Sequence, residues 1–128
     1  MKSAIDVVRD LYARLSAGDA QGALVLMTDD VEWVPMMDYK LDGRGPEKVL
    51  KGMLIPAMNE WKTFTLTPNE FVADGTKVVS IGRFKSEHRT TGKLADVNYA
   101  HVWEVRDGKI ARFRQYIDTA AIEAARLS

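Results

Sequence analysis

The chain has 128 residues, a length that fits one domain, and we expect residues 1–128 to form it. The 18 basic residues equal the 18 acidic residues, so clustered positive charge for nucleic acid or an anionic membrane is not expected. Absent cysteine excludes disulfides and thiolate-bound zinc, and two histidines exclude a histidine-rich metal site. No apolar run is long enough to span a membrane and no signal-peptide core follows Met1, which predicts a cytoplasmic protein.

The N-terminal third has the hydrophobic periodicity of helices. Ser3 followed by Asp6 resembles a capping box, and apolar residues then recur at helical spacing up to Gly18, where a helix C-cap is expected. Asp19 can cap a second short helix, with Met27 on its apolar face.

The next segment predicts a short strand and a third helix. The pair Asp29-Asp30 is expected to end the second helix, and residues 31–34 are expected to form a short strand that Pro35 stops. Residues 45–47, Gly-Pro-Glu, have the composition of a helix start, because proline is favoured at the first helical position. We expect a break or kink in this helix at Pro56.

From residue 62 onward the hydrophobic period changes from 3.6 to 2, which predicts strands. The pairs Asp74-Gly75 and Asp107-Gly108 have the composition of hairpin turns, and Pro68 marks an edge strand or a bulge. Thr119 can cap a short tail helix, and Asp118 either lies on the strand face opposite Phe113 or caps that helix. Helices followed by a long antiparallel meander predict an α+β fold, a curved antiparallel sheet with three N-terminal helices packed on its concave face.

Several motifs together resemble a known family. They are Ala17-Gly18-Asp19, the runs 27–33 and 45–47, the hairpin 100–110 and the segment 113–119. The chain resembles the SnoaL-like branch of the nuclear transport factor 2-like superfamily, also called ketosteroid-isomerase-like. The resemblance implies a cone-shaped barrel with one deep apolar pocket between helices and sheet, usually in a homodimer. It implies no single reaction, because this scaffold hosts isomerases, cyclases, dehydratases, epoxide hydrolases and non-enzymatic binders.

His101 is the strongest candidate for chemistry. Alternation along the strand 97–105 places it on one large, aromatic face with Tyr99 and Trp103. In relatives such as polyketide cyclases a histidine at this position faces the substrate. His101 could polarise a carbonyl or shuttle a proton, helped by the Tyr99 hydroxyl, or both side chains could be buried residues satisfied by their neighbours. We expect the pKa of His101 to lie below its ordinary value of about 6.5, because an aromatic pocket disfavours imidazolium.

Gln115 shares the expected pocket face of the last strand with Phe113. Several acid/base members of the superfamily carry a carboxylate at the matching position, whereas glutamine cannot take a proton. The base, tyrosine and acid of ketosteroid isomerases correspond to Pro35, Leu11 and His101 in this chain. These departures argue against general-base chemistry at residue 115 and against a steroid isomerase in the strict sense.

The remaining candidates lie in loops and on outer faces. Asp38 stands in a loop expected to cover the pocket mouth, where it is either a desolvated base or a solvated loop residue. Arg83 could fix an anionic ligand or bridge strands, and Glu32 is expected to face solvent or another strand. The expected pocket lining is rich in adaptable methionine and aromatic side chains. Its members are Trp33, Met37, Met53, Met58, Trp61, Phe84, Trp103 and Phe113.

Two functions are consistent with these residues and the resemblance. The first is a cofactor-independent enzyme acting on a small hydrophobic molecule, with His101, Tyr99 and Gln115 as catalytic groups and Asp38 as an outside candidate base. The alternative is a non-catalytic binder of small apolar ligands; a protein-interaction module is the least supported reading. We also expect a homodimer through the outer face of the sheet, where an apolar patch would otherwise meet water. That patch comprises Val79, Ile81, Ala100, Val102 and Tyr116.

Overall fold

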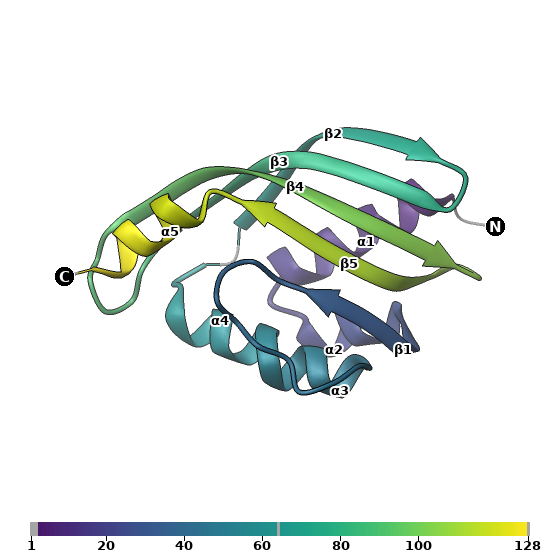
Figure 1. The fold of residues 1–128 in the computed structure, drawn as a ribbon, viewed down its shortest axis with the longest axis horizontal. Helices are drawn as coiled ribbons and strands as arrows, with labels where there is room; N and C mark the ends of the chain where they lie inside the picture. The colour runs from purple at the N-terminus through teal and green to yellow at the C-terminus, as the bar shows by residue number, and fades with distance from the viewer. Residues whose placement is uncertain (1–2, 64, 128) are drawn as a thin grey trace.

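The computed structural model describes residues 3–63 and 65–127, with the elements arranged as in Figure 1. The helices are α1 (Ala4–Ser16), α2 (Ala20–Val25), α3 (Pro46–Val49), the π-helical turn η1 (Leu50–Leu54), α4 (Ile55–Glu60) and α5 (Thr119–Arg126). The strands are β1 (Met27–Val34), β2 (Thr65–Asp74), β3 (Lys77–Glu87), β4 (Leu94–Arg106) and β5 (Lys109–Ile117). The α+β class is therefore confirmed. Phe64, which the period-2 pattern assigns to a strand, lies outside the described residues.

The strands form one curved, unclosed sheet in the order β1-β5-β4-β3-β2. Both predicted hairpin turns are present, and Gly75 and Gly108 adopt the positive φ angles, 62° and 77°, that such turns require. Pro68 lies in the edge strand β2 beside a register shift, as its missing N–H predicts. The prediction of an antiparallel sheet is wrong for β1, which pairs in parallel with β5.

The first two helices begin at the predicted caps. The Ser3 hydroxyl accepts from the Asp6 N–H, the Asp6 carboxylate accepts from the Ser3 N–H, and Asp19 accepts from the Gly22 N–H. The predicted end of the second helix is wrong: α2 stops at Val25, and Met27 and Asp29-Asp30 lie in β1. Pairing of β1 with β5 overrides the local helical pattern there.

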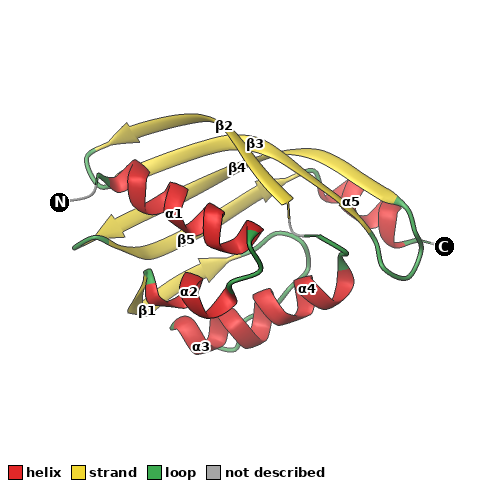
Figure 2. Cartoon of the chain, turned by 180° about the vertical axis from the view of Figure 1, so that it is seen from behind, coloured by secondary structure: helices red, strands yellow, loops and turns green. Residues whose placement is uncertain are grey.

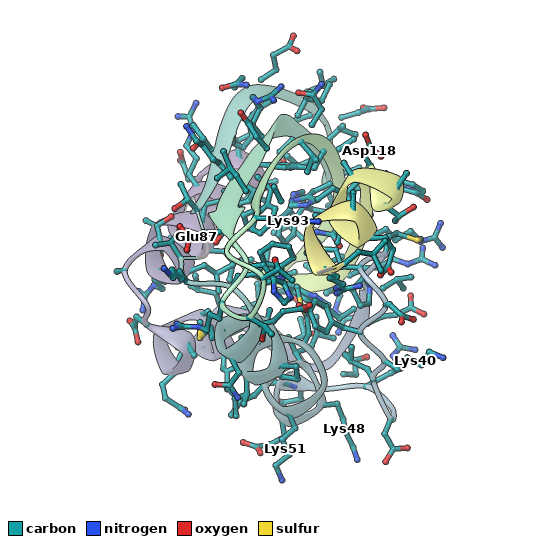
Figure 3. The ribbon with its side chains drawn as sticks, turned by 90° about the vertical axis from the view of Figure 1, so that its left-hand side faces the viewer. Lys40, Lys48, Lys51, Glu87, Lys93 and Asp118 are labelled. Atoms are coloured by element: carbon teal, nitrogen blue, oxygen red, sulfur yellow. The ribbon has the colours of Figure 1, made fainter. Side chains whose placement is uncertain are left out.

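Two further boundaries differ in detail from the sequence pattern. The irregularity expected at Pro56 takes the form of η1 just before it, where the Ile55 N–H bonds to the Leu50 carbonyl, five residues back. Of the two residues considered as the cap of α5, Asp118 is the cap and Thr119 is not, because the Asp118 carboxylate accepts from the Ala121 N–H at 3.1 Å. Figure 3 shows Asp118 at the start of this helix.

The helices and the sheet form two layers with the core between them. Figure 2 shows α1 lying across the concave side of the sheet, with α2, α3 and α4 beside β1 and α5 at the far end of the sheet. The buried side chains between the layers include Val8, Leu11, Met53, Trp103 and Phe113. Among the described residues no helix is long and apolar enough to cross a membrane, and the cytoplasmic location stays a prediction.

Candidate functional site

The neighbouring strands β4 and β5 bring the main candidate residues together on the concave side of the sheet. The inward face of β4 carries the predicted alternation, and register pairs His101 with Gln115 and Trp103 with Phe113 on β5. All four side chains are at most 2% exposed. The sheet therefore places the imidazole and the amide side by side, facing the helices.

His101 is held between α1 and β5. Its Nδ1 lies 2.6 Å from the Tyr12 hydroxyl, its Nε2 lies 3.4 Å from Nε2 of Gln115, and the Tyr99 ring stacks on it at 3.9 Å between ring centroids. Burial lowers the pKa of His101 to about 3, in the direction that its aromatic neighbours predict. The imidazole is therefore neutral at physiological pH.

Tyr12 and Ser80 extend this contact into a buried polar chain. The Tyr12 hydroxyl lies 2.6 Å from Ser80 Oγ, which accepts from Trp103 Nε1 at 2.8 Å. Burial raises the pKa of Tyr12, so it remains a hydroxyl. We did not predict either residue, although Tyr12 lies on the apolar stripe of α1 and Ser80 on the inward face of β3. A polar side chain at a position that the sequence pattern assigns to a buried face needs a hydrogen-bond partner. That need is the signal by which the sequence could have indicated Tyr12 and Ser80.

The backbone of the loop that follows β1 determines which ring nitrogen of His101 carries the proton. The Met36 N–H donates to Gln115 Oε1 at 3.1 Å, so the amide NH₂ faces His101 Nε2. Because an NH₂ group only donates, His101 Nε2 accepts and its proton lies on Nδ1. Nδ1–H then donates to Tyr12, whose hydroxyl donates to Ser80. The hydrogen bonds thus run in one direction, from Gln115 to Ser80.

A small cavity lies in front of these groups. The volume open to the centre of a water-sized molecule is about 10 Å³, room for roughly one water. The deep pocket that the resemblance implies is thus nearly closed in this structure. Its lining is mostly apolar and includes no carboxylate among the described residues. The lining comprises Tyr12, Leu15, Trp33, Met53, Leu54, Leu66, His101, Trp103, Phe113 and Gln115.

Four of the eight predicted apolar lining residues lie on this cavity: Trp33, Met53, Trp103 and Phe113. The other four lie at other clefts or in the core. Met58 and Trp61 line a more open cleft beside the end of α1, Met37 faces α5, and Phe84 is fully buried against Trp61.

Tyr99 lies one layer behind the cavity. Its ring stacks on His101, but its hydroxyl is directed toward the β3 backbone, where a Cβ on Gly82 would come within 2.7 Å of it. Burial raises the pKa of Tyr99 to about 12. The structure therefore packs the Tyr99 ring in the core and does not bring its hydroxyl to the cavity, but this hydroxyl has no hydrogen-bond partner within the described residues, unlike the satisfied hydroxyl that we considered as the alternative.

Asp38 is exposed and lies apart from His101. Its backbone has a φ of 66°, and it borders a cleft with Thr119 and Glu123 of the α5 segment. The Met36 N–H, two residues earlier, bonds to Gln115 beside the cavity, whereas Asp38 does not line the cavity. Of the two alternatives for Asp38, the exposed position agrees with the solvated loop residue.

Two charged candidates bridge strands on the outer face. Arg83 donates to the Asp96 carboxylate at 2.9 Å and to the Asn98 side chain at 2.7 Å, which decides between its two readings. Glu32 accepts from Arg112 at 2.7 Å, in agreement with its predicted outward position.

A second polar cluster, which we did not predict, surrounds Glu60. Its carboxylate accepts from the Tyr39 hydroxyl, from His88 Nε2 at 2.9 Å and from Arg126 Nε at 2.7 Å. Partial burial acts to raise the pKa of Glu60, but hydrogen bonds from Arg126, Tyr39 and His88 outweigh it and lower the pKa to about 2. Arg126 also donates to the Met37 carbonyl at 2.7 Å. The cluster therefore ties α5 and the loop to α4.

Both ring nitrogens of His88 are used within this cluster. Nδ1 accepts from the backbone N–H groups of Thr90 and Thr91, each at 3.3 Å, so Nε2 carries the proton that Glu60 accepts. A histidine beside a glutamate is a common catalytic pair, but here neither nitrogen faces a cavity with a free lone pair. We assign this pair a structural role.

Comparisons with known proteins agree with this geometry. The model of the SnoaL-like domain family matches residues 8–113. An NTF2-like protein from Burkholderia thailandensis E264 is 27% identical over 100% of both chains, with a TM-score of 0.90. TerC, co-crystallised with polyporic acid, is 29% identical over 95% of this chain and 96% of its own, with a TM-score of 0.82.

A more distant solved structure shares the fold. IdmH from Streptomyces antibioticus, proposed to be a polyketide cyclase, is 18% identical over 98% of this chain and 99% of its own, with a TM-score of 0.84. No curated protein sequence matches this chain. The family match covers most of the chain, including β4 with His101 and β5 as far as Phe113, and ends before Gln115. The chain belongs to the SnoaL-like family.

Proposed function

We propose that this chain binds a small, neutral, largely apolar molecule in the cavity between α1, η1 and the strands β4 and β5. The observation that carries the proposal is a buried apolar lining in which the polar groups, His101, Tyr12 and Gln115, are all uncharged. Such a lining favours a neutral molecule and penalises a charged one, because no opposite charge is at hand. The co-crystals of TerC with polyporic acid support the binding of a small organic molecule by a protein of this type.

A ligand requires more room than the cavity now offers, and η1 is the segment best suited to provide it. Met53 and Leu54 enter the cavity lining from this π-helical turn. The methionine side chain adapts its shape readily, and a π-helical turn interrupts the regular hydrogen bonds of an α-helix. We expect η1 and the Met53 side chain to shift when a ligand enters.

Catalysis without a cofactor is the second candidate, as an isomerase, cyclase, dehydratase or epoxide hydrolase. The ordered chain from Gln115 through His101 to Tyr12 favours it, because preformed donors can stabilise charge that develops on a substrate oxygen. Two features place it second. A base with a pKa of about 3 is weak at neutral pH, and Asp38 lies outside the cavity.

Calorimetry beside a turnover assay separates the two candidates. The ligands are a panel of neutral hydrophobic ketones, enols and epoxides, tested on the wild type, Gln115→Glu and the matched exposed control Gln21→Glu. Binding alone predicts measurable affinity without turnover, and at least about tenfold weaker affinity in Gln115→Glu, because a carboxylate enters an apolar lining. The control should match the wild type.

Two other outcomes would contradict the proposal of binding without catalysis. Turnover by the wild type that Gln115→Glu abolishes with affinity intact would establish the enzyme instead. A panel that neither binds nor reacts would refute both candidates for this class of ligand.

We also propose that two copies pair through the outer face of the sheet. Ile81 is 38% exposed and Tyr116 is 47% exposed there, beside the half-buried Val79, Ala100 and Val102. A contiguous apolar surface of this kind is typical of a protein interface, and a curved sheet can pair with a second copy of itself about a two-fold axis.

A further inference from the structure

The three tryptophans of the chain differ in what their indole nitrogens bind. Trp61 Nε1 donates to the Tyr39 hydroxyl at 3.1 Å, and Trp103 Nε1 donates to Ser80 at 2.8 Å. Trp33 Nε1 is buried and has no hydrogen-bond partner within the described residues. A buried donor left unpaired costs about 1–3 kcal/mol, so native structures seldom contain one without a reason.

The unpaired donor belongs to a side chain that lines the inner cavity. Trp33 comes from β1, stacks on Phe113 at 4.1 Å between ring centroids and meets the edge of Trp103 at 6.0 Å. The side chain is 6% exposed, so bulk water does not supply the missing acceptor. Because Trp33 lines the cavity, a molecule bound there is the source of an acceptor that this site offers.

The other polar groups of the lining already bind one another. His101 lies between Tyr12 and Gln115, and the Gln115 oxygen accepts from the Met36 N–H. The indole N–H of Trp33 is thus the polar group of the lining with no commitment within the protein. The lining therefore provides no hydrogen-bond acceptor for the Trp33 N–H within the described residues.

We propose that Trp33 Nε1–H is the donor that recognises the ligand, and that the ligand is a flat, apolar carbonyl compound such as an aryl ketone or a quinone. The inference rests on the proposed function, because it concerns the same cavity. A carbonyl oxygen supplies the acceptor that the indole lacks without bringing a proton that would itself need a partner. The flat body follows from the walls, since Trp33, Trp103 and Phe113 offer aromatic surfaces on which a ring can pack.

Two probes of one skeleton test the proposal: acetophenone, which carries a carbonyl, and ethylbenzene, which does not. Their affinities are measured by NMR titration of the wild type, Trp33→Phe and Trp61→Phe, with the ¹⁵N-indole signals assigned. We expect Trp33→Phe to weaken acetophenone binding about fivefold to tenfold, the loss of one hydrogen bond, and to change ethylbenzene binding by less than about twofold. Trp61→Phe removes an indole outside the cavity and should leave both affinities unchanged. The Trp33 indole proton of the wild type should move downfield with acetophenone only.

The outcomes distinguish this inference from the function on which it rests. If both probes bind and Trp33→Phe weakens them equally, the inference is wrong and the binding function stands. If neither probe binds the wild type, the proposed function fails for this ligand class and the inference fails with it. If Trp33→Phe does not fold, the wild-type spectra decide, because an indole signal that moves equally with both probes overturns the role of its N–H.

Discussion

The burial of His101 makes a specific prediction about how stability depends on pH. In the folded chain the pKa of this imidazole is lowered to about 3, whereas an unfolded chain has the ordinary value of about 6.5. Between these values the unfolded chain binds a proton that the folded chain does not. Stability is therefore complete above the unfolded pKa and falls as the pH drops below it.

The size of the effect follows from that difference. At pH 5.5, one unit below the unfolded value, protonation of the unfolded chain at His101 favours unfolding by about 1.4 kcal/mol, whereas at pH 7.5 the effect is close to zero. This window avoids the pH range in which most carboxylates titrate. It also lies well above the folded pKa of His101, so the folded chain keeps a neutral imidazole throughout.

Urea denaturation at pH 7.5 and 5.5 measures the effect in the wild type and in His101→Gln, which keeps a hydrogen-bonding group but cannot titrate. The wild type should lose about 1.4 kcal/mol more than the variant on acidification. His88→Gln serves as the matched control, because it removes the other histidine and should leave the contribution of His101 in place. Long-range ¹H–¹⁵N spectra should show a proton on Nδ1 of His101 at both pH values.

The reasoning is refuted if the His101 signals titrate at or above pH 6.5, since that would require an acidic partner close to the ring. Equal pH dependence in the wild type and His101→Gln would refute it as well. If His101→Gln does not fold, the NMR titration of the wild type still decides.

Three further predictions concern the stability of the fold and the pairing of two copies. Glu60→Gln should lower the free energy of unfolding at pH 7 by about 2 kcal/mol, because it removes the carboxylate that Arg126 shares with Tyr39 and His88 and leaves Arg126 paired with Glu123 alone among the described residues. It should also remove the Glu60 share of the stability that the wild type loses as the pH falls from 4.5 toward 2; urea denaturation checks both. Gly82→Ala should lower stability by about 3 kcal/mol, because its Cβ would lie 2.2 Å from the Thr67 carbonyl oxygen, and an unchanged thermal midpoint would contradict this close approach. Light scattering should give twice the chain mass of 14.3 kDa, with Tyr116→Lys shifted toward the monomer; a monomeric wild type at micromolar concentration would rule out the dimer.

The features that could be predicted from the sequence depend on neighbours in the chain. The capping box of Ser3 and Asp6, the turn at Asp107-Gly108 and the alternation around His101 each follow from rules that act over a few residues. The resemblance added the two-layer arrangement. Together they placed His101 and Gln115 on one inner face.

The features that could not be predicted depend on partners far apart in the chain. Tyr12 and His101 are separated by 89 positions, so the identity of the hydrogen-bond partner emerges only when α1 crosses the sheet. The start of β1 was misjudged because Met27 fits a helical stripe equally well until its pairing with Ile110 is known. The Met36 N–H bonds to Gln115, 79 positions away, so this contact of the loop that carries Asp38 also lies beyond local sequence rules.

The parallel pairing of β1 with β5 has a consequence for how the molecule comes together. Trp33 pairs with Phe113 across this junction, so joining the two strands closes a loop of the chain about 80 residues long. Contacts this remote in sequence form slowly, whereas the hairpins from β2 to β5 need only local turns. The cavity wall that includes the Trp33 indole is therefore completed after strands β2 to β5 have paired with one another. During synthesis this wall cannot close until β5 has left the ribosome. Until β5 pairs with it, β1 leaves Trp33, its one aromatic side chain, without its partner Phe113, and such exposed apolar surface favours aggregation of partly made chains.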